Sequence, residues 1–106
     1  LGRAGLARDD RDVIGLNEAF AAQVLSVARE WNFSDKDFDR LNPNGSGISI
    51  GHPIGATGVS MHVMAALQLM GEAGGMQIPD ARIAGVFNMG GAAVANYVSI
   101  LEPLRA

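Results

Sequence analysis

Apolar residues recur along the chain in patterns that predict two helices and three strands. A short apolar run at 13–16 is typical of a buried strand. Residues 19–31 and 57–70 each place apolar side chains on one stripe at helical spacing, which predicts two amphipathic helices. Residues 82–88 and 94–101 are rich in β-branched and apolar residues, which predicts two further strands.

The order of these elements indicates an α/β fold. Strand, helix, glycine-rich loop, helix, strand and strand follow one another, as expected for helices laid on a sheet. The pair Gly90-Gly91 between the last two strands predicts a hairpin. The predicted stripe of the first helix consists of Phe20, Val24, Val27, Ala28 and Trp31. The predicted stripe of the second helix consists of Val59, Val63, Met64, Leu67 and Met70.

Composition limits the classes of function that this chain can have. The 106 residues suit one domain, and a charged fraction of 18% indicates that much of the surface is covered by something else. The net charge of -3 offers no footprint for nucleic acid or an anionic membrane. The only lysine is Lys36, which excludes a Walker A loop, and the lack of cysteine excludes disulfides, thiolate metal sites and a cysteine nucleophile on this chain.

The ends of the chain carry little targeting information. Residues 1–8 contain no apolar run of the kind that a secretory signal needs, and no stretch reaches the roughly 18 apolar residues of a membrane span. We therefore expect a cytoplasmic protein without a membrane partner. The first residue is Leu1, which leads us to expect a fragment or a processed chain.

Three sites combine a polar side chain with glycine-bearing or apolar surroundings. Asn17, after the first strand, can cap the following helix or present its amide to a ligand at the strand end. His52, between Gly51 and Pro53, can be a structural histidine, a general base or an oxyanion donor. Residues 88–91 can form a plain turn or line an anion pocket with their backbone N–H groups.

Two other features do not point to function. His62 lies on the flank of the second predicted helix, where we expect a helix-surface or boundary residue. The glycines at 45, 47 and 51 miss the dinucleotide-binding fingerprint, because the third glycine of that fingerprint would stand at Ile50.

Two sequence blocks resemble the C-terminal end of the thiolase family, the acetyl-CoA acyltransferases. Residues 17–23 read NEAFAAQ, and residues 42–58 read NPNGSGISIGHPIGATG. The likeness extends over about 4–102, which corresponds to roughly the last quarter of a family chain. It implies the C-terminal part of the thiolase fold, with a mixed sheet covered by helices. Residues 1–106 would then form a C-terminal domain that lacks its N-terminal half.

The resemblance also implies acyl transfer on coenzyme A thioesters, with no covalently bound cofactor and no metal. In the family, a cysteine of the N-terminal half takes up the acyl group, and the histidine matching His52 activates it. The asparagine matching Asn17 holds a water in the oxyanion pocket, and the glycine matching Gly90 donates its N–H to a second oxyanion hole. The expected partners are an acyl-CoA and either an N-terminal thiolase half or further copies of the same protein.

One departure from the family pattern keeps other functions open. Asn88 stands where the family has the cysteine of a Cys-x-Gly motif, and an amide does not exchange a proton near neutral pH. A non-catalytic thiolase-like subunit that binds acyl-CoA or a partner protein is therefore the alternative, although a scaffold has no need of His52. A relative of the ketoacyl synthases is a further possibility, which residues 17–20 fit less well.

Overall fold

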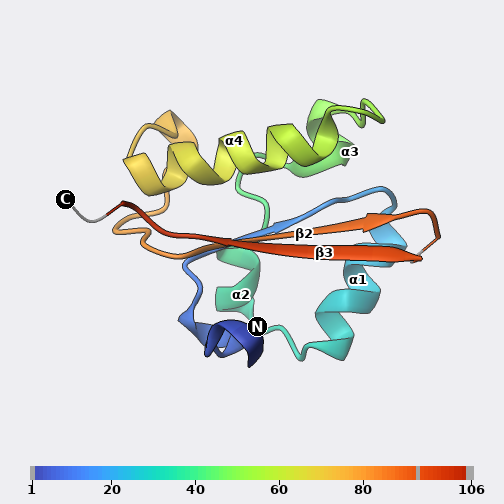
Figure 1. Cartoon of the computed structure of the whole chain (residues 1–106), viewed down its shortest axis with the longest axis horizontal. Helices are drawn as coiled ribbons and strands as arrows, with labels where there is room; N and C mark the ends of the chain where they lie inside the picture. Colours follow the sequence, from blue (N-terminus) through green and yellow to red (C-terminus); the bar gives the residue numbers. More distant parts are fainter. Residues whose placement is uncertain (1, 93, 105–106) are drawn as a thin grey trace.

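A mixed three-stranded sheet forms the centre of the computed structural model, which describes residues 2–92 and 94–104. The strands β1 (Val13–Leu16), β2 (Ala84–Gly90) and β3 (Ala95–Leu101) lie in that order. β1 runs parallel to β2, and β2 runs antiparallel to β3. Helices cover the sheet from above and below in Figure 1. The arrangement confirms the predicted α/β class, with a mixed sheet covered by helices.

Among the described residues, four α-helices surround this sheet: α1 (Ala21–Glu30), α2 (Asp35–Asp39), α3 (Ser46–Ile50) and α4 (Thr57–Met70). Short 3-10 turns occur at Gly2–Ala4, Arg8–Asp10 and Gly74–Met76. α4 has the bounds that its sequence predicts, whereas α1 begins two residues later than expected. The glycine-rich segment is more ordered than predicted, because α3 forms within it. In Figure 1, α3 and α4 lie above the sheet and α1 and α2 lie below it.

β2 begins and ends two residues later than its sequence predicts. Asp12 explains the late start, because its carboxylate accepts hydrogen bonds from the backbone N–H groups of Arg82 (2.8 Å) and Ile83 (2.9 Å). The predicted hairpin is confirmed, since β2 and β3 pair directly and Gly91 has a left-handed φ of 54°. At the opposite edge of the sheet, residues 40–42 pair with β1: the Ile14 N–H donates to Arg40 O, and the Asn42 N–H donates to Ile14 O.

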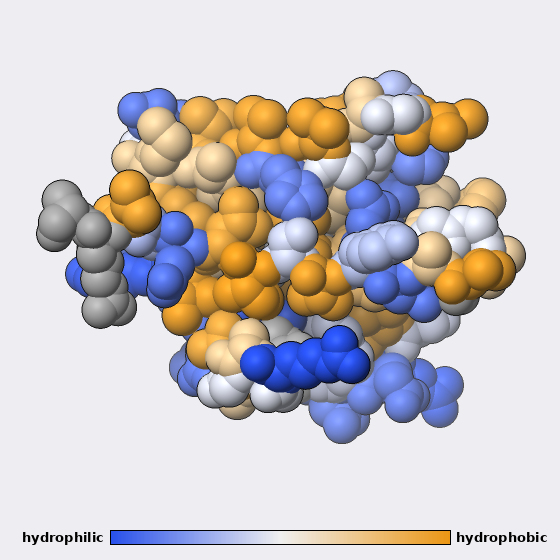
Figure 2. Space-filling view, in the orientation of Figure 1, coloured by the Kyte–Doolittle hydropathy of each residue, from blue (hydrophilic) through white to orange (hydrophobic). Residues whose placement is uncertain are grey.

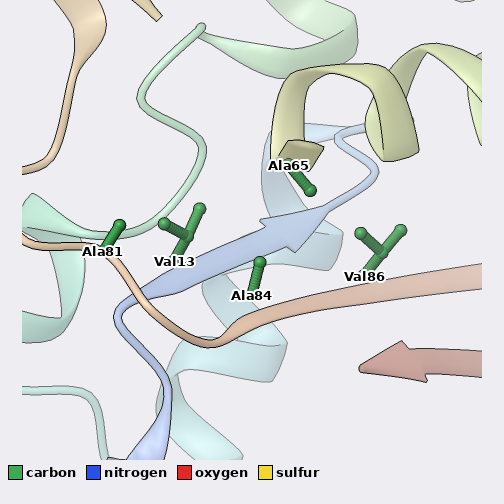
Figure 3. Packing of buried hydrophobic residues seen from close by; sticks show 5 residues of the cluster. All are labelled: Val13, Ala65, Ala81, Ala84 and Val86. Atoms are coloured by element: carbon green, nitrogen blue, oxygen red, sulfur yellow. The ribbon is translucent and has the colours of Figure 1, made fainter. Parts of the chain in front are cut away.

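The core between α4 and the sheet is built from small side chains. Figure 3 shows the five residues of this cluster, Val13, Ala65, Ala81, Ala84 and Val86. Ala65 lies on α4 and Ala84 is fully buried on β2. Methyl-sized side chains at these positions let the helix pack closely on the strands.

The predicted stripe of α4 is wrong for much of its length. Val59, Val63 and Met70 are 65%, 51% and 64% exposed, whereas Thr57, Ala65 and Gln68 are buried. Apolar residues surround most of this helix, so their spacing does not select one face. The polar Gln68 is accommodated inside because its amide donates to Met76 O (2.6 Å) and accepts from the Ile78 N–H (2.8 Å).

Apolar side chains consequently remain on the outer surface of α4. Figure 2 shows them as a row along the top of the molecule, over this helix. We call Val59, Val63 and Met70 the outer face of α4. On the first helix the prediction is partly confirmed: Val24 and Ala28 are buried, but Phe20 precedes α1 and is 75% exposed. No helix among the described residues has the length and apolar character needed to cross a membrane.

Candidate functional site

Asn17 follows directly on β1 and is only 7% exposed. It does not cap α1, because that helix starts at Ala21 and its capping position is Phe20. The Asn17 side-chain oxygen Oδ1 is buried and has no hydrogen-bond partner among the residues described. A buried acceptor without a donor indicates a place where a water or another polar group belongs. The structure therefore favours the ligand interpretation of Asn17 over the capping one.

Two polar side chains hold the end of β1 and with it Asn17. Asn42 is clamped to Leu16 in both directions: the Leu16 N–H donates to Asn42 Oδ1 (2.8 Å), and Asn42 Nδ2 donates to Leu16 O (2.7 Å). The Ser46 hydroxyl donates to Leu16 O (3.1 Å) and accepts from the Glu18 N–H (3.3 Å). Asn17 is thus flanked on both sides by backbone groups that are fixed from a distant part of the chain.

α3 connects the Asn17 region to His52. Gly47 lies against Asn17: a Cβ at this position would be 3.3 Å from Asn17 Oδ1 and 3.1 Å from Glu18 O. Only glycine fits there without a shift of the neighbouring backbone. At the other end of α3, Gly51 has a left-handed φ of 89° and immediately precedes His52. Four residues of helix advance about 6 Å along the axis, so Asn17 and His52 belong to the same region of the molecule.

His52 has an exposed ring that is held at one nitrogen. Its Nδ1 lies 2.7 Å from the hydroxyl oxygen of Thr57, the buried first residue of α4. That hydroxyl also donates to Pro53 O at 3.1 Å. Nε2 of His52 has no hydrogen-bond partner in the described part of the chain. The ring is thus anchored on its Nδ1 side, while Nε2 remains available to a reacting group.

Asn88 lies on β2 beside the first turn of α4. A Cβ added at Gly58 would be 2.7 Å from Asn88 Nδ2, so the lack of a side chain at Gly58 makes room for the Asn88 amide. Gly58 follows Thr57, the hydrogen-bond partner of His52. The His52 ring and the Asn88 amide therefore lie against neighbouring residues in the first turn of α4. Gly90 lies at the end of β2, where it is exposed and pairs with Ala95.

The first turn of α4 also borders a small cavity between α4, α3 and β1. The cavity measures about 30 Å³, and its lining includes Gly47, Thr57 and Met61. This volume admits a single water molecule rather than a cofactor. Within 2–92 and 94–104, no three or more histidine, aspartate and glutamate side chains are grouped in a way that could hold a metal ion.

His62 differs from His52 in having both ring nitrogens occupied. Its Nδ1 lies 2.6 Å from Gly58 O, and its Nε2 lies 2.9 Å from the Ser99 hydroxyl. The half-buried ring therefore links α4 to β3, in agreement with its prediction as a helix-boundary residue.

Three positioning side chains were not singled out in the sequence. The Asn-Pro-Asn-Gly turn is predictable, but not that the Asn42 side chain clamps a strand 26 residues away. Ser46 and Thr57 each stand at the first position of a helix, one residue after the capping position that hydroxyl side chains favour, so the capping pattern does not single them out. The signal that could have found Thr57 is its spacing of five residues from His52, across a turn closed by Pro53.

Comparisons with known proteins show the family of the chain. The family model "Thiolase, C-terminal domain" matches residues 1–99. A 3-oxoadipyl-CoA/3-oxo-5,6-dehydrosuberyl-CoA thiolase of Escherichia coli K12 is 51% identical over 69 residues, which are 65% of this chain and 17% of that protein. Beta-ketothiolase BktB of Cupriavidus necator is 54% identical over 69 residues, again 65% and 17%. An acetyl-CoA acetyltransferase of Syntrophomonas wolfei is 51% identical over 63 residues, 59% and 16%.

The matched region is a small part of each relative. The chain spans about 17% of the length of the curated thiolases that it matches. The family model nevertheless covers nearly all of the chain, and the sheet and helices have the architecture that the resemblance implies. This chain belongs to the thiolase family and forms a segment of its C-terminal domain.

Proposed function

We propose that this chain supplies the histidine and the oxyanion elements of a thiolase-type acyl transfer on coenzyme A thioesters. The observation that carries the proposal is the His52 ring, held at Nδ1 by Thr57 with Nε2 left open. The relatives named as thiolases support this class of reaction. Because the chain contains no cysteine, the nucleophile belongs to another part of the working protein.

His52 acts as the base that activates this nucleophile. Nε2 takes the proton of the cysteine thiol, and the thiolate attacks the thioester carbonyl carbon. The resulting oxyanion collapses, the bond from carbon to the coenzyme A sulfur breaks, and the leaving thiolate recovers the proton from His52. An acyl-enzyme remains, and the acyl group passes from it to the second substrate.

Asn17 and Gly90 stabilise negative charge on the reacting oxygens. The buried, unpartnered Oδ1 of Asn17 supports a bound water beside it, which can donate to a thioester oxyanion. Gly90 offers its backbone N–H at the exposed end of β2, where it has no side chain of its own to hinder a substrate. These two positions correspond to two separate oxyanion pockets.

Asn88 determines how fast the steps after acylation, condensation and thiolysis, can proceed. A carboxamide can donate a hydrogen bond to an enolate oxygen but cannot take and return a proton as a cysteine can. We therefore expect rapid acylation of the full-length protein but slow condensation and thiolysis. Asn88→Cys should raise thiolysis by a factor of about 10² to 10⁴, the usual contribution of general acid–base catalysis, without changing the rate of acylation. Fast thiolysis by the native protein would show that another residue supplies the proton.

The test of the main proposal compares the two histidines of this chain. In the full-length protein, His52→Gln should slow single-turnover release of coenzyme A by about 10² to 10⁴, because the thiol loses its base. His62→Gln is the matched control: it removes a ring bonded on both nitrogens, so it should lower stability and leave acylation near native. Undiminished acylation of His52→Gln would refute the catalytic role of His52.

The alternative function is a thiolase-like subunit that binds acyl-CoA without transforming it. Asn88 favours this alternative, because it removes the proton-transfer group. Intact-mass spectrometry after mixing with acyl-CoA separates the two: a non-catalytic subunit binds acyl-CoA with no covalent labelling of the protein, whereas a transferase becomes acylated within the first turnover.

We propose further that the outer face of α4 packs against the rest of the working protein. A contiguous apolar face such as Val59, Val63 and Met70 is unusual on the side of a helix that stays in contact with water in the working protein. Its occupant would be the N-terminal part of the longer protein, which is consistent with the 17% coverage of the relatives. Thiolases form dimers or tetramers, and we expect this protein to be an oligomer as well.

A further inference from the structure

The contact between His52 and Thr57 determines which ring nitrogen of His52 carries the proton. Nδ1 of His52 lies 2.7 Å from Thr57 Oγ1, and the same oxygen lies 3.1 Å from Pro53 O. A hydroxyl has a single proton, and a carbonyl oxygen can only accept. Both contacts are hydrogen bonds at once only if the hydroxyl donates to Pro53 O and accepts from a protonated Nδ1.

The other arrangement is electrostatically poor. If Thr57 donated to a bare Nδ1, its oxygen would face Pro53 O at 3.1 Å with lone pairs on both sides and no proton between them. Thr57 is only 6% exposed, so solvent does little to relieve such a contact. The short chain from Nδ1 through the hydroxyl to the Pro53 carbonyl therefore stabilises one neutral tautomer.

We propose that Thr57 is a positioning residue that keeps His52 in the Nδ1–H tautomer. In this form Nε2 carries the lone pair that a general base needs, and it points away from the anchored side of the ring. When Nε2 gains a proton, Nδ1 remains a donor and the bond to Thr57 persists, so neither protonation state requires the ring to move. This inference rests on the proposed base function of His52.

The first test is a tautomer measurement on the native protein. Magic-angle-spinning NMR of the full-length protein with ¹⁵N-labelled histidine distinguishes a protonated from a bare ring nitrogen, and His52→Gln identifies the signals of His52 by subtraction. We expect neutral His52 to carry its proton on Nδ1. A proton on Nε2 of neutral His52 in the native protein would overturn the inference.

Variants of Thr57 provide the second test. Thr57→Val keeps the shape but removes the hydroxyl, so we expect the Nε2–H tautomer to appear and acylation to slow about tenfold with KM unchanged. Thr57→Ser keeps the hydroxyl and should retain the native spectrum and rate. Ser60→Ala is the matched control, since it deletes a hydroxyl one turn along α4 that donates to Thr57 O and does not contact His52.

The outcomes separate this inference from the proposed function. A changed His52 spectrum in Thr57→Val with unchanged acylation would support the positioning role and refute His52 as the base. A native spectrum in Thr57→Val would refute the positioning role and leave the base function standing. If Thr57→Val does not fold, the tautomer of the native protein and the behaviour of Thr57→Ser still decide the matter.

Discussion

Replacing Asn42 with alanine removes the clamp that holds the end of β1. The Asn42 side chain accepts from the Leu16 N–H (2.8 Å) and donates to Leu16 O and to Glu18 Oε1, both at 2.7 Å. Both Asn42 and Leu16 are buried, at 8% and 2% exposure. Alanine leaves the Leu16 N–H without this partner, whereas Leu16 O keeps the Ser46 hydroxyl.

The expected loss of stability can be worked out from these contacts. An unpaired buried N–H costs about 1–3 kcal/mol. Asn42 also has a left-handed φ of 46°, which costs alanine roughly a further 1 kcal/mol because asparagine tolerates this region better. We therefore expect Asn42→Ala to lower the free energy of unfolding by about 3 kcal/mol, a large share of the 5–15 kcal/mol of a typical domain.

Urea unfolding followed by the fluorescence of Trp31, the single tryptophan, measures this loss. With a slope of about 2 kcal/mol per molar urea, the midpoint should fall by about 1.5 M. Asp80→Ala is the control for the backbone contribution, since Asp80 has a similar φ of 54° but an exposed side chain. If Asp80→Ala and Asn42→Ala shift the midpoint equally, the clamp contributes nothing and this reasoning fails.

Two further predictions concern the buried carboxyl of Asp37 and the exposed outer face of α4. The Arg40 guanidinium and the Ser34 N–H hold the pKa of the Asp37 carboxyl well below its ordinary value of 3.8. These two hydrogen bonds to the ionised carboxylate therefore stabilise the fold above pH 3.8, and their contribution is lost as the pH falls below 3.8 toward the lowered pKa. Asp37→Asn should therefore flatten the acid side of the stability curve, and equal acid sensitivity of variant and native chain would contradict the sign. The isolated chain should self-associate through the outer face of α4, and Val63→Glu should shift it toward monomer in light scattering; an unchanged mass would count against that face.

The bounds of α4 were predictable from the sequence, but its orientation was not. Its start at Thr57 and its end before Gly71 follow from local signals, including the left-handed φ of 75° that glycine adopts at the helix end. Which face is buried depends on partners outside the helix. Gln68 is buried because Met76 O and the Ile78 N–H form hydrogen bonds with its amide. The sequence of residues 57–70 alone does not predict these hydrogen bonds.

The sequence predicts which residues belong to the candidate site, but not the contacts that position them. His52 and Asn17 stand out as polar residues at a glycine loop and a strand end. Their supports do not stand out, because Asn42 and Ser46 contact residues 26 to 30 positions earlier. Thr57 is the exception: it lies only five residues from His52, near enough for local reasoning to find it.

The long reach of the Asn42 and Ser46 bonds has a consequence for the order of events in folding. A helix such as α4 closes contacts between near neighbours within microseconds, whereas the end of β1 is fixed only after a loop of 26 to 30 residues has closed. The loop-closure entropy of that step places it late, after the helices have formed. Changes at Asn42 should accordingly speed unfolding more than they slow folding. The end of β1 and the adjacent Asn17 are then among the last parts of the chain to become ordered and among the first to open.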